Sequence, residues 1–363
     1  MDISQIDKNF ALNAIKETNI VWINALQTPI SLHGVYFSEE EHRYRRMPKE
    51  VADSVNNGVS GLAKYTAGGR VRFITDSPYV AFKCVVPQNA IMAHMPISGS
   101  FGLGVYENNV FIGRCSPTSQ QMIGGIDNKC AFEGILYTRT EGEKSVDVYL
   151  PLYGGLHDLY IGIKEGSSLK EPKPYAHPQQ VVFYGSSITQ GGCASVPGSD
   201  YIGLLCRWLD TEVYNLGFSG SARGEKEMAD YLASLDASVF VLDYDWNAPT
   251  VEHLQATHLP LYETIRKAHP TTPIIFITKP DYDSNPQLSA ERRDVIRKTY
   301  EIALSRGDTL VDFIDGETLF GGHGRDGCSA DCCHPNDLGF YRMAENIRPV
   351  LEEILKGEKG ERL

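Results

Sequence analysis

The sequence predicts a protein of the α/β class in two parts, an all-β sandwich followed by a parallel sheet with helices on both faces. Residues 20–163 hold many short β-type runs spaced by about ten residues, and the region after residue 180 alternates apolar runs with helical segments. Between them, residues 164–179 are polar and carry three prolines. At 363 residues the chain is long enough for two domains, which we expect over residues 1–175 and 176–363.

The first half is predicted to be a sandwich or jelly roll, because turn residues such as those at 76–78 and 154–155 separate its strand-like runs. We expect strands over residues 20–24, 34–37, 71–75, 79–86, 102–106, 109–115, 134–137, 145–150 and 159–163. No long amphipathic helix is expected in this half.

The second half is predicted to form five parallel strands joined by helices, since strand and helix patterns alternate five times. The expected strands cover residues 181–184, 212–216, 238–243, 273–278 and 309–313. The expected helices cover residues 199–209, 225–235, 251–268, 287–305 and 336–356. Because ligands of such sheets bind outside the carboxyl ends of the strands, the loops that follow the strands are the places to search for a site.

The composition excludes several classes of partner. A net charge of −12 without any long run of Lys and Arg argues against binding nucleic acid or an anionic membrane surface. No apolar stretch approaches the length of a membrane span, and residues 1–17 lack the features of a signal peptide. We therefore expect a cytoplasmic protein, or an exported one whose leader is not part of this sequence. The eight cysteines suit a reducing compartment without requiring one.

The loop after the first strand of the second half is the first candidate for chemistry. It reads Gly185-Ser186-Ser187-Ile188-Thr189, in which glycine allows a sharp turn and leaves a serine exposed at the strand tip. The alternative is a serine that only caps a helix. A phosphate-binding loop is not expected because no lysine follows.

A second candidate lies before the last helix, where Asp331 and His334 stand three residues apart. When the loop curls, the carboxylate can hold the imidazole in one tautomer and stabilise its charged form. Pro335 suits the first turn of the following helix and helps to fix the histidine. The alternative is a helix start that contains a histidine by chance.

Two further loops can supply hydrogen-bond donors. The segment Asn215-Leu216-Gly217-Phe218-Ser219-Gly220 is rich in small residues and can present a backbone N–H, and the segment 243–247 ends in the amide of Asn247. An oxyanion formed in acyl transfer needs two or three such fixed donors near the nucleophile. Either segment could instead be an ordinary turn.

These four loops, in this order, resemble the four conserved blocks of the SGNH hydrolases, the superfamily of GDSL-type esterases. The resemblance covers residues 180–356 and implies a flavodoxin-like three-layer α/β/α domain. It implies Ser187 as nucleophile, His334 and Asp331 as the rest of a catalytic triad, and Ser187, Gly220 and Asn247 as donors of the oxyanion hole.

Two positions depart from the usual blocks. Ser186 stands where the first block has Asp, and the third block reads Asp243-x-Asp245-x-Asn247 in place of Gly-x-Asn-Asp. In the first half, residues 44–48 and 156–162 are similar to the N-terminal module of two-domain members such as some carbohydrate acetyl esterases.

The expected function is therefore that of a serine esterase, a carboxylic ester hydrolase that removes short acyl groups, acetyl above all, from a carbohydrate or a small-molecule ester. Neither metal nor other cofactor is expected. Tyr244 and Trp246 flank the third block and could stack on a sugar ring, or could simply pack the loop. The sequence does not name the sugar, the acyl group, the ester position or the oligomeric state.

Three alternatives stay open. An acyltransferase would pass the acyl group to another alcohol, and a carbohydrate-binding protein would use the fold without catalysis. A zinc module could draw on Cys193, Cys328, Cys332, Cys333 and His334, although adjacent cysteines fit zinc less well than paired Cys-x-x-Cys spacings. Some of these cysteines could instead form disulfides, or stay reduced and buried.

Overall fold

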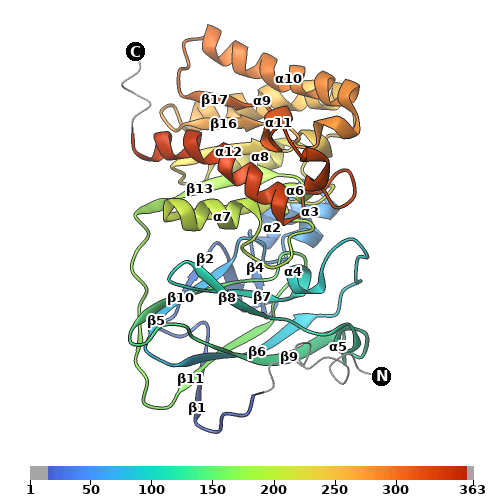
Figure 1. Cartoon of the computed structure of the whole chain (residues 1–363). Helices are drawn as coiled ribbons and strands as arrows, with labels where there is room; N and C mark the ends of the chain where they lie inside the picture. The colour runs from blue at the N-terminus through green and yellow to red at the C-terminus, as the bar shows by residue number, and fades with distance from the viewer. Residues whose placement is uncertain (1–14, 358–363) are drawn as a thin grey trace.

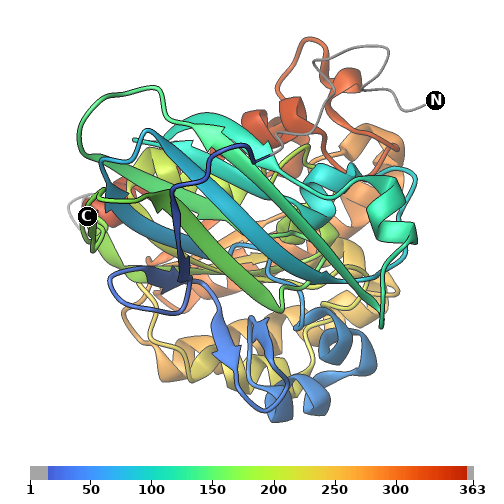
Figure 2. The same cartoon turned by 90° about the horizontal axis from the view of Figure 1, so that it is seen from below.

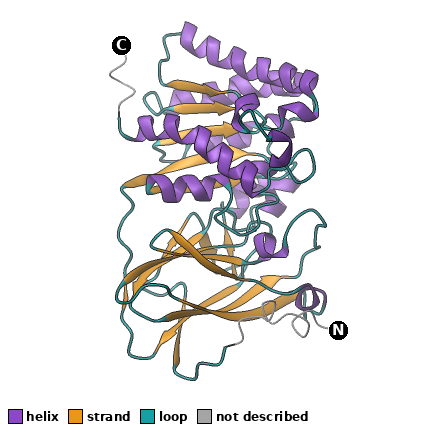
Figure 3. Ribbon diagram, in the orientation of Figure 1, coloured by secondary structure: helices purple, strands orange, loops and turns teal. Residues whose placement is uncertain are grey.

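The computed structural model describes residues 15–357 and consists of a β-sandwich below a parallel sheet that is covered by helices (Figure 1). Colouring by secondary structure separates the two parts, with antiparallel strands in one and alternating strands and helices in the other (Figure 3). The predicted fold class is confirmed. A division of the chain at residues 175 and 176 stays a prediction.

Two antiparallel sheets form the sandwich. The outer sheet has the order β1-β11-β6-β9 and faces the viewer in Figure 2. Its strands are β1 (Ile20–Asn24), β11 (Asp158–Lys164), β6 (Tyr79–Pro87) and β9 (Lys129–Tyr137). The inner sheet contains β12 (Leu169–Lys170), β5 (Arg70–Thr75), β10 (Lys144–Tyr149), β7 (Leu103–Glu107) and β8 (Val110–Cys115), with β2 (Ser31–His33) paired to β5. Alternate residues of both sheets, such as Val80, Phe82, Val146 and Val148, fill the core between them.

The strand predicted over residues 34–37 is misplaced. Gly34 has a positive φ of 68°, which ends β2 and turns the chain into a small hairpin of β3 (Tyr36–Ser38) and β4 (Arg43–Arg45). Among its described residues, this half also contains four short helices: α2 (Lys49–Val55), α3 (Asn57–Leu62), α4 (Ile97–Phe101) and α5 (Ser119–Ile123). Their length is too short for a clear amphipathic pattern in the sequence.

The second sheet is parallel throughout and has the strand order β14-β13-β15-β16-β17. Its strands are β13 (His177–Gly185), β14 (Thr211–Gly217), β15 (Val239–Asp243), β16 (Ile274–Ile277) and β17 (Val311–Ile314). In order of sequence this is 2-1-3-4-5, the doubly wound arrangement of flavodoxin. The chain reverses direction of winding at β13, which places the loops after β13, β14 and β15 side by side.

Helices cover both faces of this sheet. One face packs on α7 (Tyr201–Leu209), α11 (Gly316–Leu319) and α12 (Asp337–Leu355), and the other on α8 (Lys226–Ala233), α9 (Val251–Ala268) and α10 (Pro286–Ser305). Short helical turns occupy several loops: α6 (Ser187–Gln190), η2 (Asp245–Asn247), η3 (Tyr282–Ser284) and η4 (Arg325–Cys328). Among residues 15–357, none of the helices combines the length and the apolar composition that a bilayer span requires.

The first half of the chain also completes the core of the parallel sheet. Apolar residues of α2 and α3, among them Ala52, Val55 and Val59, pack with Val182, Leu216 and other residues of the second face. The two halves therefore share an apolar core, which the sequence pattern of either half does not show.

Candidate active site

The site lies where three neighbouring strands end together. Gly185 of β13 pairs with Gly217 of β14 on one side and with Asp243 of β15 on the other. The three loops that follow carry Ser187, Gly220 and Asn247. Parallel pairing therefore brings the first three predicted blocks to one edge of the sheet.

Ser187 opens the short helix α6 directly after a tight strand-to-helix turn. The Ser186 hydroxyl caps this helix by accepting the Ile188 N–H at 3.1 Å. Ser186 is the residue that stands where the first SGNH block usually has Asp. Gly185 has no alternative here, because a Cβ would lie 2.0 Å from Thr189 Oγ1 and 2.3 Å from the Asp243 carbonyl oxygen. The turn fixes Ser187 at the strand tip.

His334 and Asp331 come from the loop between η4 and α12 and form a hydrogen-bonded chain with Ser187. His334 Nε2 lies 2.8 Å from Ser187 Oγ, and His334 Nδ1 lies 2.8 Å from Asp331 Oδ2. The other carboxylate oxygen of Asp331 accepts the backbone N–H groups of Cys333 and His334 at 3.1 and 2.7 Å. The loop thus curls around the Asp331 carboxylate, which orients the imidazole toward the serine.

The Asp331 carboxylate is held in its ionised form. Partial burial raises its pKa, but hydrogen bonds from the His334 backbone N–H and ring outweigh that effect, and the pKa lies below its ordinary value. An ionised Asp331 stabilises the positive charge that His334 acquires when it takes a proton.

Possible oxyanion donors face the same edge. Gly220 has a φ of 67°, which turns the backbone of its loop into the left-handed region. Within residues 15–357, no hydrogen bond engages the N–H of Ser187 or of Gly220. Both groups are free to donate to a ligand.

The polar side chains of the segment 243–247 differ in their hydrogen bonds. Asp243 Oδ2 accepts hydrogen bonds from Thr189 and Tyr201 at 3.0 and 3.1 Å, and Asp245 Oδ2 accepts the Lys279 N–H at 3.1 Å. Both aspartates therefore hold the frame. By contrast, the buried amide oxygen of Asn247 has no hydrogen-bond partner among the described residues. This unpartnered atom is a hydrogen-bond acceptor, so it does not by itself identify Asn247 as a donor to an oxyanion.

Residues 178–352 match the GDSL-like Lipase/Acylhydrolase family, and residues 20–169 match the N-terminus of SGNH hydrolase-type esterases. The chain belongs to the SGNH hydrolase superfamily. It is an esterase, a carboxylic ester hydrolase, with the two-domain architecture that carbohydrate esterases share.

Solved structures resemble this SGNH hydrolase over nearly its whole length. A GDSL-like lipase of Bacteroides ovatus is 28% identical with a TM-score of 0.81, over 93% of this chain and 98% of that one. A salicylyl-acyltransferase of a tetracycline biosynthetic pathway is 20% identical with a TM-score of 0.74, over 93% and 98%. A family two carbohydrate esterase of Clostridium thermocellum, in complex with cellohexaose, is 14% identical with a TM-score of 0.61, over 90% and 99%. None of the curated proteins matches the chain significantly.

The sandwich of this SGNH hydrolase contacts the site directly, through residues that the sequence analysis did not single out. Tyr153, in the loop after β10, donates its hydroxyl to the Ser187 carbonyl oxygen at 3.1 Å. Gln190 of α6 donates to the Leu152 carbonyl at 3.2 Å and accepts the Ser219 N–H at 3.0 Å. These bonds tie the serine turn and the Gly220 loop to the sandwich.

Arg46 is a second such contact and lies completely buried. Its guanidinium donates to the carbonyl oxygens of Asn215 and Gly217 at 3.2 and 2.6 Å, immediately before the Gly220 loop, and lies 4.7 Å from the centre of the Phe218 ring. The same group also bonds the carbonyls of Leu62 and Tyr65. Only the motif 44–48 pointed to this residue in the sequence.

Of the two aromatic residues expected to bind substrate, one is corrected. Tyr244 is 1% exposed, packs against Tyr184 and His258, and pairs its hydroxyl with Thr257 at 3.1 Å, which leaves no surface for a sugar. Trp246 is half-buried, with Lys279 Nζ 3.8 Å from its ring centre. It borders the histidine loop through Cys333, so it stays a candidate for contact with substrate.

The cysteines do not gather as a zinc module would require. All eight are free thiols, and six of them are buried. Among the described residues, the potential metal ligands that lie within 4.8 Å of one another are His94, Cys193, Asp331 and His334, and this group includes none of Cys328, Cys332 and Cys333.

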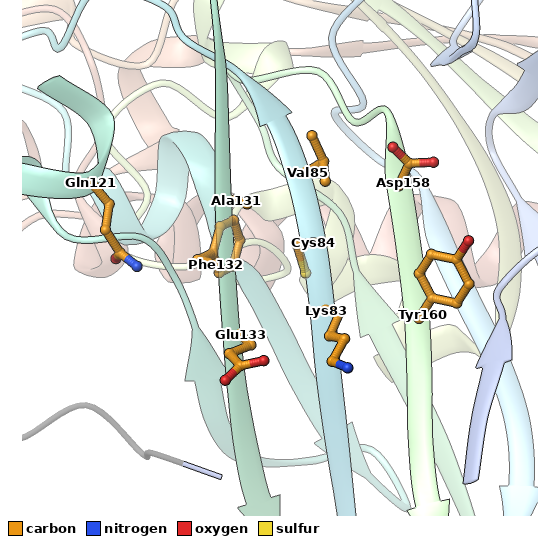
Figure 4. Close-up of a pocket in the computed structure, with 9 residues that line it drawn as sticks. All are labelled: Lys83, Cys84, Val85, Gln121, Ala131, Phe132, Glu133, Asp158 and Tyr160. Atoms are coloured by element: carbon orange, nitrogen blue, oxygen red, sulfur yellow. The ribbon is translucent and has the colours of Figure 1, made fainter. Parts of the chain in front are cut away.

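A cavity of about 590 Å³ lies away from the site, on the outer sheet of the sandwich. Figure 4 shows its lining of Lys83, Glu133, Asp158 and Tyr160 with neighbouring residues from β6, β9 and β11. No residue that lines it belongs to the triad loops.

Proposed function

We propose that this SGNH hydrolase removes short acyl groups, acetyl first among them, from a carbohydrate or a small-molecule ester through a covalent acyl-enzyme on Ser187. The observation that carries the proposal is the chain of two 2.8 Å contacts that joins Ser187 Oγ, His334 and Asp331. A nucleophile bonded to a base that is itself oriented by a third group is the arrangement that nucleophilic acyl transfer requires.

In the first half of the reaction, His334 Nε2 takes the Ser187 hydroxyl proton while Oγ attacks the ester carbonyl carbon. The tetrahedral intermediate then collapses, the bond to the alcohol breaks, and the protonated His334 gives its proton to the departing alkoxide. In the second half a water molecule loses a proton to His334 and attacks the acyl-enzyme, which releases the acid and restores the Ser187 hydroxyl. Asp331 stays ionised and stabilises the imidazolium in both halves.

The oxyanion of each intermediate is stabilised by the N–H groups of Ser187 and Gly220 and by the side-chain amide of Asn247. The unengaged N–H groups of Ser187 and Gly220 and the common sheet edge of the three loops support this assignment, and the amide nitrogen of Asn247 is assigned by its place in the third block. Such donors are fixed before the reaction begins, and the loss of one typically raises the barrier by about 2.7–4 kcal/mol.

Carbohydrate esters are the substrates that the surroundings favour. Trp246 is half-buried beside the histidine loop, and Lys279 Nζ and Arg292 Cζ lie 3.8 and 5.3 Å from its ring centre, so the exposed edge of the indole is the part proposed to contact a sugar. Proteins of the same fold include carbohydrate esterases, among them an acetyl xylan esterase of Butyrivibrio proteoclasticus with 13% identity and a TM-score of 0.58.

The test begins with 4-nitrophenyl acetate and the variant Ser187→Ala. We expect the wild-type protein to release nitrophenol and the variant to lose kcat by at least about 10⁴-fold, because the nucleophile is gone. Ser234→Ala, at an exposed serine of the C-terminal end of α8, is the matched control and keeps wild-type activity. A variant Ser187→Ala with wild-type turnover would remove this residue from the mechanism.

Two further assays identify the nucleophile and the substrate class. Labelling with a sulfonyl fluoride, followed by peptide mass spectrometry, should modify Ser187 and fail in the variant. Acetyl release is then compared across acetylated xylan, acetylated mannan and simple acetylated sugars. If added sugar alcohols capture the acyl group in preference to water, the protein is an acyltransferase on the same chemistry.

A further inference from the structure

We propose that His94, Cys193, Asp331 and His334 form a binding site for a soft divalent cation such as Zn²⁺, and that the bound cation inhibits the esterase. The inhibitory consequence rests on the function proposed above, whereas the binding site rests on the side chains alone.

The four residues converge from both halves of the chain. His94 lies in the sandwich loop between β6 and α4, Cys193 follows α6, and Asp331 and His334 belong to the loop before α12. Each offers one ligand atom, and these four atoms all lie within 4.8 Å of one another. The His94 and His334 rings are tilted by 38° with their centres 5.6 Å apart, so both imidazoles border the same small volume.

The donor set suits zinc better than it suits a hard cation. Imidazole, thiolate and carboxylate are the ligands that Zn²⁺ takes in proteins, usually four in a tetrahedron, whereas Mg²⁺ and Ca²⁺ take oxygen ligands. With bonds of 2.0–2.3 Å, tetrahedral ligand atoms stand roughly 3.5 Å apart. The group therefore has to contract by about an ångström, and exposed His94 can supply that movement. Cys193 gives up its thiol proton when its sulfur binds the cation.

Binding of the cation and catalysis exclude each other at His334. Both ring nitrogens are already used, Nε2 toward Ser187 and Nδ1 toward Asp331. A cation on Nε2 takes the lone pair that would accept the serine proton. A cation on Nδ1, or on the Asp331 carboxylate, replaces the contact that orients the ring. In either geometry the hydroxyl of Ser187 loses its base.

The first experiment measures binding without any ester. Zn²⁺ is titrated into the metal-free full-length protein by calorimetry and by competition with a fluorescent zinc chelator. We expect one Zn²⁺ per chain, also in Ser187→Ala, and an affinity at least about tenfold lower in His94→Ala and in Cys193→Ser. His323→Ala and Cys332→Ser remove an exposed histidine and an exposed thiol outside the group and serve as controls with wild-type affinity.

The second experiment measures hydrolysis of 4-nitrophenyl acetate against the concentration of Zn²⁺. Wild type and both controls should lose activity and regain it with EDTA. His94→Ala should need at least about tenfold more zinc for half inhibition, measured relative to the activity of the same variant without zinc. Since Cys193 is buried and its substitution could disturb folding, exposed His94 decides the result if Cys193→Ser does not fold.

The outcomes separate the two proposals. Equal zinc affinity in wild type and His94→Ala, or no binding, overturns the cation site and leaves the esterase proposal intact. Zinc binding through His94 and Cys193 in a protein that hydrolyses no ester would overturn the proposed function and leave the binding site standing. Hydrolysis that zinc leaves unaffected, in a protein that binds zinc at these residues, would overturn the inhibition.

Discussion

Gly192 sets how closely His334 can approach Ser187, and Gly192→Ala tests that geometry. A Cβ at this position would lie 2.9 Å from the Tyr153 hydroxyl, 3.1 Å from the Ser187 carbonyl oxygen and 3.2 Å from His334 Cδ2. Ordinary carbon contacts begin near 3.5 Å, so each of the three neighbours has to retreat by a few tenths of an ångström. All three belong to the arrangement proposed for catalysis or adjoin it.

Two magnitudes follow. Tyr153 loses its hydrogen bond to the Ser187 carbonyl, worth about 1 kcal/mol, and overpacking adds about 1–3 kcal/mol, so we expect the free energy of unfolding to fall by about 2–4 kcal/mol. The Ser187–His334 contact of 2.8 Å lengthens. Since a misplacement of about 1 Å can cost about 10²-fold in rate, a shift of half that size should lower kcat about tenfold.

The assay combines urea denaturation with kcat for 4-nitrophenyl acetate. Gly61→Ala is the matched control, because a Cβ at that helical position of α3 meets nothing within 4 Å. It should leave kcat unchanged and stabilise the protein slightly, since alanine favours helix over glycine. A folded Gly192→Ala protein with kcat within twofold of wild type would refute the argument that this close approach sets the serine–histidine geometry.

Asn247→Ala should lower kcat by about 10²–10³-fold with little change in stability, because it removes one proposed oxyanion donor and no hydrogen bond of the frame. A variant with a raised KM and an unchanged kcat would contradict that role. Asp331→Asn should lower kcat by about 10⁴-fold. The carboxylate accepts two backbone N–H groups through one oxygen and the His334 ring N–H through the other, and an amide has only one oxygen to accept them. A wild-type kcat would show that the loop orients His334 without the carboxylate. Burial lowers the pKa of His258 to about 3, so the folded state stays neutral while the unfolded state takes up a proton below about pH 6.5, and stability should fall by about 2 kcal/mol from pH 7 to pH 5. Urea denaturation should show that the free energy of unfolding falls less between pH 7 and pH 5 in His258→Asn than in wild type. An equal fall in both proteins would assign the acid sensitivity to other groups.

The sequence by itself predicted the two-part architecture and, through the resemblance of four loops to the SGNH blocks, the residues proposed for the triad. Apolar alternation in the first half and apolar runs between amphipathic segments in the second are local patterns, which depend on period and turn residues alone. The loops around Ser187 and His334 were candidates because each adjoins a regular element and carries residue types suited to acyl transfer, and the resemblance of four such loops in order to the SGNH blocks assigned their roles.

Only the tertiary structure decided which neighbours these residues have. The pairing of β13 with both β14 and β15 brought Gly220 and Asn247 to the same edge as Ser187. Tyr244 is buried and Trp246 is only half-buried, although the two residues are two positions apart in the sequence. Arg46, Tyr153 and His94 reach the site from a different half of the chain, and contacts over such separations leave no periodic pattern for a sequence reading to detect. Long-range packing, which no local preference encodes, gave the sandwich its part in the site.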